Sequence, residues 1–409
     1  MIKLFSSDKF FLVLLSVAII LSRLFVFYFY RDINLENEWI NLFHNLKTSG
    51  VLGYHVLVDN NLLVQKFSGA GDVVIPSVWM PPFYIFFLYS IDFVFGRILP
   101  FVSTIIIIQI LLNLFSIYIF FKIIKNFFDN RDSLLITIIY AFFPALIFSS
   151  VQISSSTLQI FLILCFFYFL LENFLKSKKL SVINFSIISG MLILTRGEFV
   201  VFYILAISYF FIFKEKKFKN LIVSLIVTLL IISPYLIRNY KNFNTVVLTK
   251  SFGYNLLKGN NQNFKVEGDV VIINKIRENL NIKIDNNFEI NLDNIYRDEA
   301  IKYIKENPGI FVQNYFKKVF SFLFINLNSS YDNYYNPFHI IPKAIISLCA
   351  LFSGIIGLRK GGFFQFLSIF YFLNILLFSL FFILPRYSVV LIPVQIILTS
   401  MAFKTYKEK

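Results

Sequence analysis

The sequence predicts an all-α polytopic membrane protein from its composition, its apolar runs and the spacing of its polar stretches. Hydrophobic residues form 57% of the 409 residues and charged residues only 15%, whereas a soluble domain carries about 25% charged residues. Apolar runs of roughly 18 residues or more, the length that crosses a bilayer as a helix, recur along the chain. Two long polar stretches, at 31–97 and 238–337, interrupt them. We expect a bundle of about ten transmembrane helices with two long extracytoplasmic loops.

The composition also excludes several classes of protein. The formal net charge of +15 would suit nucleic acid, but Lys and Arg lie in short segments between apolar runs, where the positive-inside rule places them. We therefore expect membrane lipids as partners and no nucleic acid. The only cysteines, Cys165 and Cys349, fall inside predicted spans, so neither a disulfide framework nor a thiolate metal site is expected.

The apolar runs give the predicted spans in order. The first span covers 10–30, and the polar stretch 31–97 follows it. Within that stretch, residues 82–96 are apolar but too short to cross comfortably, so they are expected to lie at the interface or to re-enter the membrane. Further spans are expected at 98–121, 133–149, 153–171, 181–195, 198–213, 219–237, 339–357 and 363–384, with a last one that ends near 403.

The polar stretches are expected to contain helices of their own. Acidic residues open a short helix after residue 36, which ends near Ser49-Gly50. Residues 293–307 predict a second helix, capped by Asp293 or Asn291 and ended by Pro308-Gly309. Apolar positions along 311–322 share one helical face, which is typical of an amphipathic helix lying in the membrane interface.

The distribution of basic residues predicts the topology. The basic clusters at the N-terminus and at 122–131, 176–179, 214–219, 359–360 and 404–409 all fall on one side. The positive-inside rule makes that side cytoplasmic, together with both termini. Both long polar stretches and the turns around Arg196 and Arg386 then face the opposite side. We expect three regions: a transmembrane domain at 1–237 with the first loop, an extracytoplasmic loop with an interfacial helix at 238–337, and C-terminal transmembrane helices at 338–409.

Three acids follow the first predicted span, at Asp32, Glu36 and Glu38. An acid at a helix N-terminus is stabilised by the helix dipole, which is the structural interpretation. A carboxylate can also act as a general base that takes the proton from an attacking hydroxyl group. The spacing of the three acids is compatible with both interpretations.

Short motifs in a fixed order give this chain a family resemblance. They are Glu38-Trp39, Asn45-Leu46, Gly50, Gly53-Tyr54, Met80-Pro81-Pro82-Phe83-Tyr84, Gly190, Leu194-Thr195-Arg196, Ser233-Pro234-Tyr235-Leu236-Ile237-Arg238-Asn239-Tyr240, Gly253-Tyr254-Asn255-Leu256, Gly259-Asn260-Asn261, Asn307-Pro308 and Pro385-Arg386-Tyr387. In this order the chain resembles the superfamily of dolichyl-phosphate-mannose-protein mannosyltransferases and aminoarabinose transferases. These are glycosyltransferases with the GT-C fold that use polyprenyl-phosphate sugars.

The resemblance implies a fold, an activity and a site. It implies a GT-C bundle in the bacterial inner membrane, with the active site on the periplasmic face. The reaction would move a sugar, with inversion, from a polyprenyl-phosphate donor to a lipid, glycan or protein acceptor. An acid of the first loop would be the base, with Glu38 the best match, Glu36 second and Asp32 third. The chain departs from many relatives at Ser156, where they carry Glu.

Cations near the span ends are candidates for binding the donor phosphate, because the departing phosphate needs fixed positive groups. They are Arg196, Arg238, Arg386, Lys317 and Lys318. The alternative is that each side chain reaches out to lipid headgroups. Arg23 lies inside the first span, where a charge is costly and often functional, although it can also pair with a nearby carbonyl or acid.

The sequence leaves a metal and two other functions open. His44, His55 and His339 lack metal-ligand spacing, so no metal residues are assigned. Asp72, Asp92 and the acids at 267–299 are nevertheless candidate oxygen ligands for a divalent metal. A transporter or flippase of polyprenyl-linked glycans is one alternative, which the absence of a visible repeat disfavours. A polymerase or ligase of such glycans is the other. The sequence identifies neither the sugar nor the acceptor.

Overall fold

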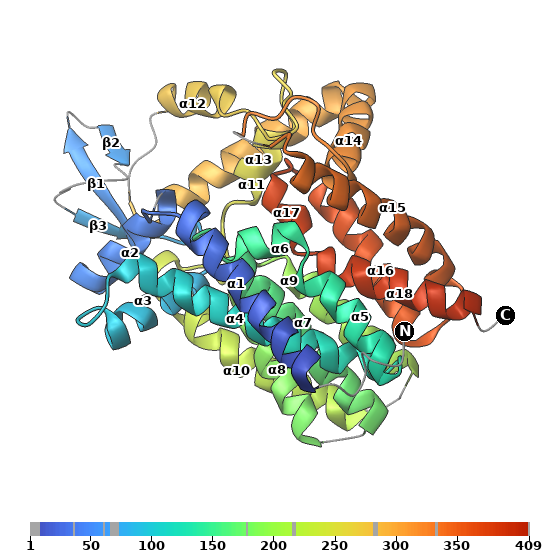
Figure 1. Ribbon diagram of the computed structural model, residues 1–409. Helices are drawn as coiled ribbons and strands as arrows, with labels where there is room; N and C mark the ends of the chain where they lie inside the picture. The colour runs from blue at the N-terminus through green and yellow to red at the C-terminus, as the bar shows by residue number, and fades with distance from the viewer. Residues whose placement is uncertain are drawn as a thin grey trace.

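The computed structural model describes residues 9–35, 37–59, 62–65, 73–176, 179–214, 218–280, 285–331 and 334–407. Within these residues the chain forms eighteen α-helices, one π-helical segment and three short strands (Figure 1). The predicted helical membrane class is therefore confirmed, with one small sheet that the sequence did not lead us to expect.

The helices of the membrane region follow the predicted spans. Five are long and apolar enough to cross a bilayer: α1 (Lys9–Tyr30), α4 (Phe101–Ile124), α7 (Ser156–Lys176), α10 (Phe218–Phe243) and α15 (Pro337–Leu358). Shorter apolar helices lie among them: α3 (Phe83–Phe95), α8 (Lys179–Thr195), α9 (Phe199–Ala206), which continues as the π-helical segment Ile207–Lys214, and α16 (Gly362–Phe378). The chain is a multi-pass membrane protein.

Two predicted spans differ in detail from the observed helices. The span expected at 133–149 is two helices, α5 (Asn130–Ala141) and α6 (Pro144–Ser149). Proline lacks an N–H and disfavours a helical residue before it, so the helix stops and restarts at Pro144. The last span begins later than the Pro385 turn: α17 (Pro385–Val389) is a short helix, and α18 runs from Ile392 to Lys407.

The first polar stretch contains α2 (Asn37–Ser49) and a three-stranded antiparallel sheet of β1 (Gly53–Asp59), β2 (Leu62–Gln65) and β3 (Val73–Pro76). The strand order is β2-β1-β3, with Val56 opposite Gln65 and Tyr54 opposite Ile75. The amide of Asn45 donates to the Gly53 carbonyl at 2.8 Å, which joins α2 to β1. A Cβ atom at Gly53 would lie 2.0 Å from the Ile75 carbonyl oxygen, so this motif glycine is required by strand pairing.

The second polar stretch contains α11 (Phe252–Gly259), α12 (Val271–Glu278), α13 (Phe288–Glu306) and α14 (Pro308–Leu323). The helix predicted at 293–307 exists but begins at Phe288, with Asn287 at its N-cap position. The predicted capping role of Asn291 or Asp293 is therefore wrong, because Asn291 lies in the first turn of the helix and Asp293 in the second. The Asp293 carboxylate instead accepts a hydrogen bond from the Tyr254 N–H at 3.0 Å, which fixes α11 on α13.

Segments that the topology prediction places on the same side of the membrane lie at the same end of the helix bundle. At one end Lys404 Nζ donates to the Phe127 carbonyl, and the Tyr209 hydroxyl donates to the Gly362 carbonyl. At the other end lie the small sheet and α11 to α14 (Figure 1). There the Ile383 N–H donates to the Val266 carbonyl at 2.8 Å. The two polar stretches thus share one end of the molecule.

Candidate active site

Asp32 is fixed where α1 ends. Its carboxylate oxygen Oδ2 accepts a hydrogen bond from the Ile153 N–H at 2.6 Å, and its own N–H donates to the Val151 carbonyl at 3.1 Å. The Gln152 side-chain amide donates to the Tyr30 carbonyl at 3.1 Å. The last residues of α1 are therefore fastened to the turn between α6 and α7, and the Asp32 carboxylate lies beside the start of α7.

Buried polar side chains lie next to Asp32. The Tyr84 hydroxyl donates to the Gln109 side-chain carbonyl at 3.2 Å, and Gln109 donates to the Gln152 carbonyl at 2.8 Å. The negative charge of Asp32 acts on the Tyr84 phenol. The Trp39 ring of α2 meets the Tyr84 ring edge-on at 4.9 Å. Tyr84 ends the Met80–Tyr84 motif, so that motif helps to build the surroundings of Asp32.

The other two predicted acids are Glu36 and Glu38. Glu36 and the side chain of Glu38 lie outside the described residues, although the backbone of Glu38 belongs to the first turn of α2. The short helix predicted here is present as α2, which buries Trp39, Leu42 and Phe43. The predictions for Glu36 and Glu38 remain predictions.

Two of the predicted cations come together around one aromatic ring. The Arg196 Nε pairs with Glu198 at 2.6 Å, and its guanidinium carbon lies 4.9 Å from the ring centres of Phe378 and Tyr387. Burial raises the pKa of Tyr387, and the positive charges of Arg196 and Arg386 partly offset this. Arg386 itself is exposed and lies in α17. The two arginines are 190 residues apart in sequence and flank the same phenol.

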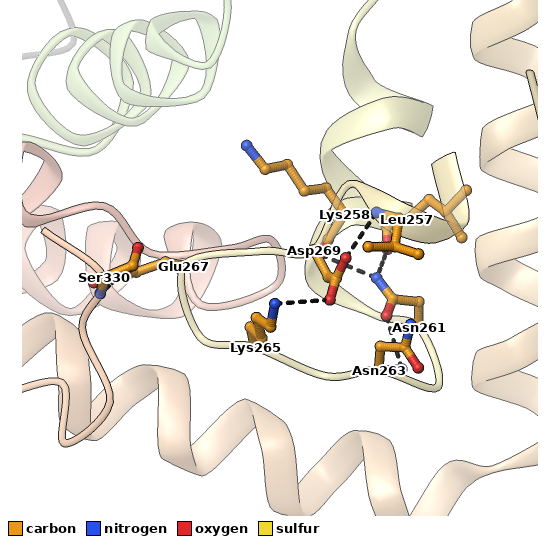
Figure 2. Close-up of polar contacts among 9 residues, drawn as sticks. Leu257, Lys258, Asn261, Asn263, Lys265, Glu267, Asp269 and Ser330 are labelled. Carbon is orange, nitrogen blue, oxygen red and sulfur yellow. Dashed lines mark hydrogen bonds and ion pairs between the residues drawn. The ribbon is translucent and has the colours of Figure 1, made fainter. Parts of the chain in front are cut away.

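A third cation, Lys258, lies beside this pair and was missed by sequence reasoning. Its ammonium group lies 4.3 Å from the ring centre of Phe382 and 5.9 Å from that of Tyr254. The Phe382 and Tyr387 rings are 6.0 Å apart. In Figure 2 the Lys258 side chain extends away from the loop that carries Asn261 and Asp269. We call Arg196, Lys258 and Arg386 the cation cluster.

Glu267 joins the loop after α11 to the segment after α14. Its carboxylate accepts hydrogen bonds from the Asn326 amide at 2.9 Å, from the Ser330 N–H at 2.9 Å, from the Ser330 hydroxyl at 2.8 Å and from the Ser329 hydroxyl. Figure 2 shows Glu267 beside Ser330. Burial alone would raise the pKa of Glu267, but these hydrogen bonds lower it below its ordinary value. The carboxylate therefore stays ionised and holds both segments beside Tyr331 and Arg386, whose charge also acts on the Tyr331 phenol.

Two of the other predicted phosphate ligands hold the protein itself together. The Arg238 guanidinium donates to the Ser77 and Leu52 carbonyls at 2.7 Å each, so it fixes the first polar stretch against α10. Lys318 is fully buried and donates to Asn260 Oδ1 at 2.8 Å and to the Gly259 carbonyl at 3.3 Å. Lys317 is exposed, with its ammonium 5.7 Å from the Phe264 ring centre. The structure brings together Arg196 and Arg386 but not these three.

Lys318 gives a pH prediction for stability. Burial lowers its pKa from 10.5 to about 7, so the folded protein holds this proton less tightly than the unfolded chain. The resulting cost is absent above the unfolded pKa, develops as pH falls and is complete below about 7. We expect Lys318→Met to gain thermal stability relative to wild type as pH is lowered from 9 to 6, measured as the difference in Tm. Exposed Lys317→Met is the control, and a difference that stays constant with pH for Lys318→Met would contradict the prediction.

The described residues contain no group of three or more His, Cys, Asp or Glu side chains that could hold a metal ion. Asp72 lies outside the described residues, and Asp92 pairs with Lys47 at 2.8 Å. Asp269 pairs with Lys265 at 3.2 Å and accepts from the Val271 N–H at 2.7 Å (Figure 2). No divalent-metal site is assigned to these acids.

Known proteins resemble this chain in part of its sequence and in its fold. The family model described as dolichyl-phosphate-mannose-protein mannosyltransferase matches residues 80–237. The apo oligosaccharyltransferase of Archaeoglobus fulgidus aligns with a TM-score of 0.58 and 14% identity, over 98% of this chain and 51% of that one. The same protein tethered with an acceptor peptide containing the NVT sequon gives 0.55 and 12%, over 98% and 50%. ArnT from Cupriavidus metallidurans in the apo state gives 0.52 and 13%, over 97% of this chain and 61% of ArnT.

These likenesses confirm the predicted GT-C fold. The chain spans about half the length of the oligosaccharyltransferase and 61% of ArnT. Among curated proteins, none matches this sequence. The family match begins at residue 80, so Asp32, Glu36 and Glu38 lie before it.

Proposed function

We propose that this protein, which has the GT-C fold and resembles the mannosyltransferase family over 80–237, is a membrane glycosyltransferase. Its donor would be a sugar linked to polyprenyl phosphate, and its acceptor a lipid, a glycan or a protein. The observation that carries the proposal is the position of Asp32 relative to the cation cluster. Asp32 binds Ile153 just before α7. α8 packs back along α7 and ends at Thr195, directly before Arg196, and α17, which carries Arg386, also packs against α7. A carboxylate and three cations therefore lie at the same end of the bundle.

The geometry supports Asp32 as the base. Its carboxylate is held through Oδ2 by a backbone N–H that cannot swing away. In the proposed reaction it takes the proton of the acceptor hydroxyl while the hydroxyl oxygen attacks the anomeric carbon. The bond from that carbon to the phosphate oxygen breaks on the opposite face, so the configuration inverts. If the acceptor is itself a phosphate, no proton needs to be removed and Asp32 orients the acceptor.

The cation cluster supports the departure of the polyprenyl phosphate. Negative charge grows on the phosphate as the sugar leaves, and positive groups that are already in place stabilise it. Arg196 and Arg386 offer planar guanidinium groups suited to phosphate oxygens, and Lys258 adds a point charge. The aromatic rings of Tyr387 and Phe382 pack against Arg196 and Lys258 and help to orient these two cations.

We further propose that the site faces the periplasm in a bacterial inner membrane. Support comes from the basic segments around Lys404 and Lys122, which share the end of the bundle opposite the site. Both termini would then be cytoplasmic. The chain would then have three regions: a membrane domain at 1–237, an external cover at 238–337 and a group of C-terminal helices at 338–409.

The test is sugar transfer by the purified full-length chain in proteoliposomes. A panel of labelled polyprenyl-phosphate sugars is supplied with lipid, glycan and peptide acceptors. Transfer of label with release of polyprenyl phosphate is the expected result. Movement of labelled lipid across the bilayer without transfer from any donor would contradict the enzyme and support the flippase alternative.

The cation cluster gives its own prediction. Lys258→Gln is expected to lower kcat/KM for the donor on the order of 10²-fold, because one positive group facing the leaving phosphate is lost. Lys265→Gln is the matched control, since Lys265 lies in the loop that follows α11 and pairs with Asp269. Steady-state kinetics with varied donor measure both. Equal activity in the two variants would remove Lys258 from the proposed site.

A further inference from the structure

Helix α1 has little apolar packing against the rest of the protein. Within Leu12–Tyr30, only 6% of the most apolar 18-residue stretch is buried inside the protein. Lipid tails are as apolar as leucine, so the hydrophobic effect does not press such a helix onto its neighbours. Polar contacts and close packing must therefore decide where α1 sits. The position of α1 matters because Asp32 follows it directly.

Arg23 is the exception on this helix, with 1% of its surface exposed. Its Nε and Nη2 atoms both donate to Asn113 Oδ1 of α4 at 3.1 Å, and Nη2 donates to the Ala141 carbonyl at 2.6 Å. Nη1 donates to Ser22 Oγ at 2.8 Å within α1 itself. No described acid pairs with Arg23. The guanidinium thus meets neutral oxygens from helices α4 and α5.

The acceptors for Arg23 are produced by the break between α5 and α6. Ala141 is the last residue of α5, where carbonyls lack intrahelical donors and the helix dipole is negative. Asn113 turns its amide to the Leu146 carbonyl of α6 at 3.3 Å, which points its oxygen toward Arg23. α6 then leads into the turn whose Val151 and Ile153 hold Asp32. Arg23 and Asp32 are therefore bound to the same segment, one at its start and one at its end.

We propose that Arg23 is a positioning residue that tethers α1 to Asn113 and Ala141 so that Asp32 stays in its catalytic place. The proposal rests on the proposed function, since it assigns Arg23 a role through Asp32. An alternative role is stability alone, because a buried charge whose partners are removed is strongly destabilising. The experiment must therefore separate position from folding.

The variant that does so replaces both partners together. Arg23→Met with Asn113→Leu removes the charge and its main acceptor, and such apolar exchanges often leave stability unchanged. We expect normal yield and thermal unfolding, with kcat lowered by about 10–100-fold and little change in KM, because a misplacement near 1 Å can cost about 10²-fold. Leu24→Ala, an exposed neighbour on α1, is the control. Arg23→Lys is expected to keep part of the activity, since it keeps the positive charge but lacks the planar, five-donor guanidinium group.

A position readout makes the result independent of activity. Tyr30 and Phe148 have ring centres 6.4 Å apart across α1 and α6. Cysteines at these two positions, with Cys165 and Cys349 replaced by alanine, are joined by a short bifunctional thiol reagent. The double apolar variant is expected to cross-link less than the parent, and the cross-linked fraction is expected to recover kcat.

Each failure has a distinct meaning. Unchanged cross-linking and unchanged kcat in the double variant would overturn the tether. Reduced cross-linking with no recovery of kcat in the cross-linked fraction would also overturn it as a device that positions Asp32. If the parent protein transfers no sugar at all, the proposed function fails while the cross-linking yields still report whether Arg23 holds α1.

Discussion

Asp32→Asn is expected to lower kcat by about 10²–10⁴-fold, the range that a general base contributes. Asparagine keeps an oxygen that can accept from the Ile153 N–H, so the turn between α6 and α7 should remain in place. The variant loses only the capacity to take a proton. Binding of polyprenyl phosphate, measured by its protection of the protein from thermal unfolding, should stay close to wild type.

Three matched amide variants decide which acid is the base. Glu38→Gln and Glu36→Gln change the other first-loop candidates, and Asp92→Asn changes an acid that pairs with Lys47 away from this site. Turnover within a few fold of wild type is expected for all three. Loss of turnover in Glu38→Gln with activity kept in Asp32→Asn would move the base to α2 and leave Asp32 with a structural role.

Gly253→Ala should be strongly destabilising. A Cβ atom at this position would lie 1.9 Å from the Asp293 carbonyl oxygen and 2.6 Å from the Arg297 nitrogen. Both atoms belong to the backbone of α13 and cannot move aside, so α11 itself must shift. We expect a loss of about 1–3 kcal/mol or more in the free energy of unfolding. Thermal unfolding in detergent measures it as a lower Tm.

The control for this glycine lies in the same polar stretch. A Cβ atom at Gly309 would meet nothing within 4 Å, so Gly309→Ala should leave Tm unchanged or raise it slightly. Because α11 carries Lys258 at its C-terminal end, Gly253→Ala should also reduce donor turnover in whatever protein remains folded. Equal Tm for the two variants would show that α11 can move away from α13 at little cost.

The sequence predicted the membrane helices well because apolar length is a local property. The sheet at 53–76 was missed, although two short valine-containing apolar runs separated by only two residues, Asn60-Asn61, are compatible with a hairpin. The break at Pro144 was also readable, since proline acts on its own neighbours. The start of α13 was misplaced because Asp293 resembles a cap, while its actual partner is the distant Tyr254 N–H.

The site was harder to predict because its members meet only in the folded chain. Arg196 and Arg386 became candidates because of their turns, but those turns gave no sign that both would flank Tyr387. Lys258 precedes the Gly259-Asn260-Asn261 motif and was overlooked, since its partner ring is Phe382. Arg238 sits at a similar span end, yet it binds the Ser77 and Leu52 carbonyls. Sequence position alone does not distinguish an arginine of the cation cluster from one that binds backbone carbonyls.

The Glu267 carboxylate binds donors from Asn326, Ser329 and Ser330 through a single side chain. The loop around residue 267 and the segment around 326–330 therefore cannot open separately without leaving this charge or its donors unsatisfied. Their local unfolding should be one cooperative event, with a shared opening free energy. These two segments would then behave as a single kinetic unit, with one opening rate for both.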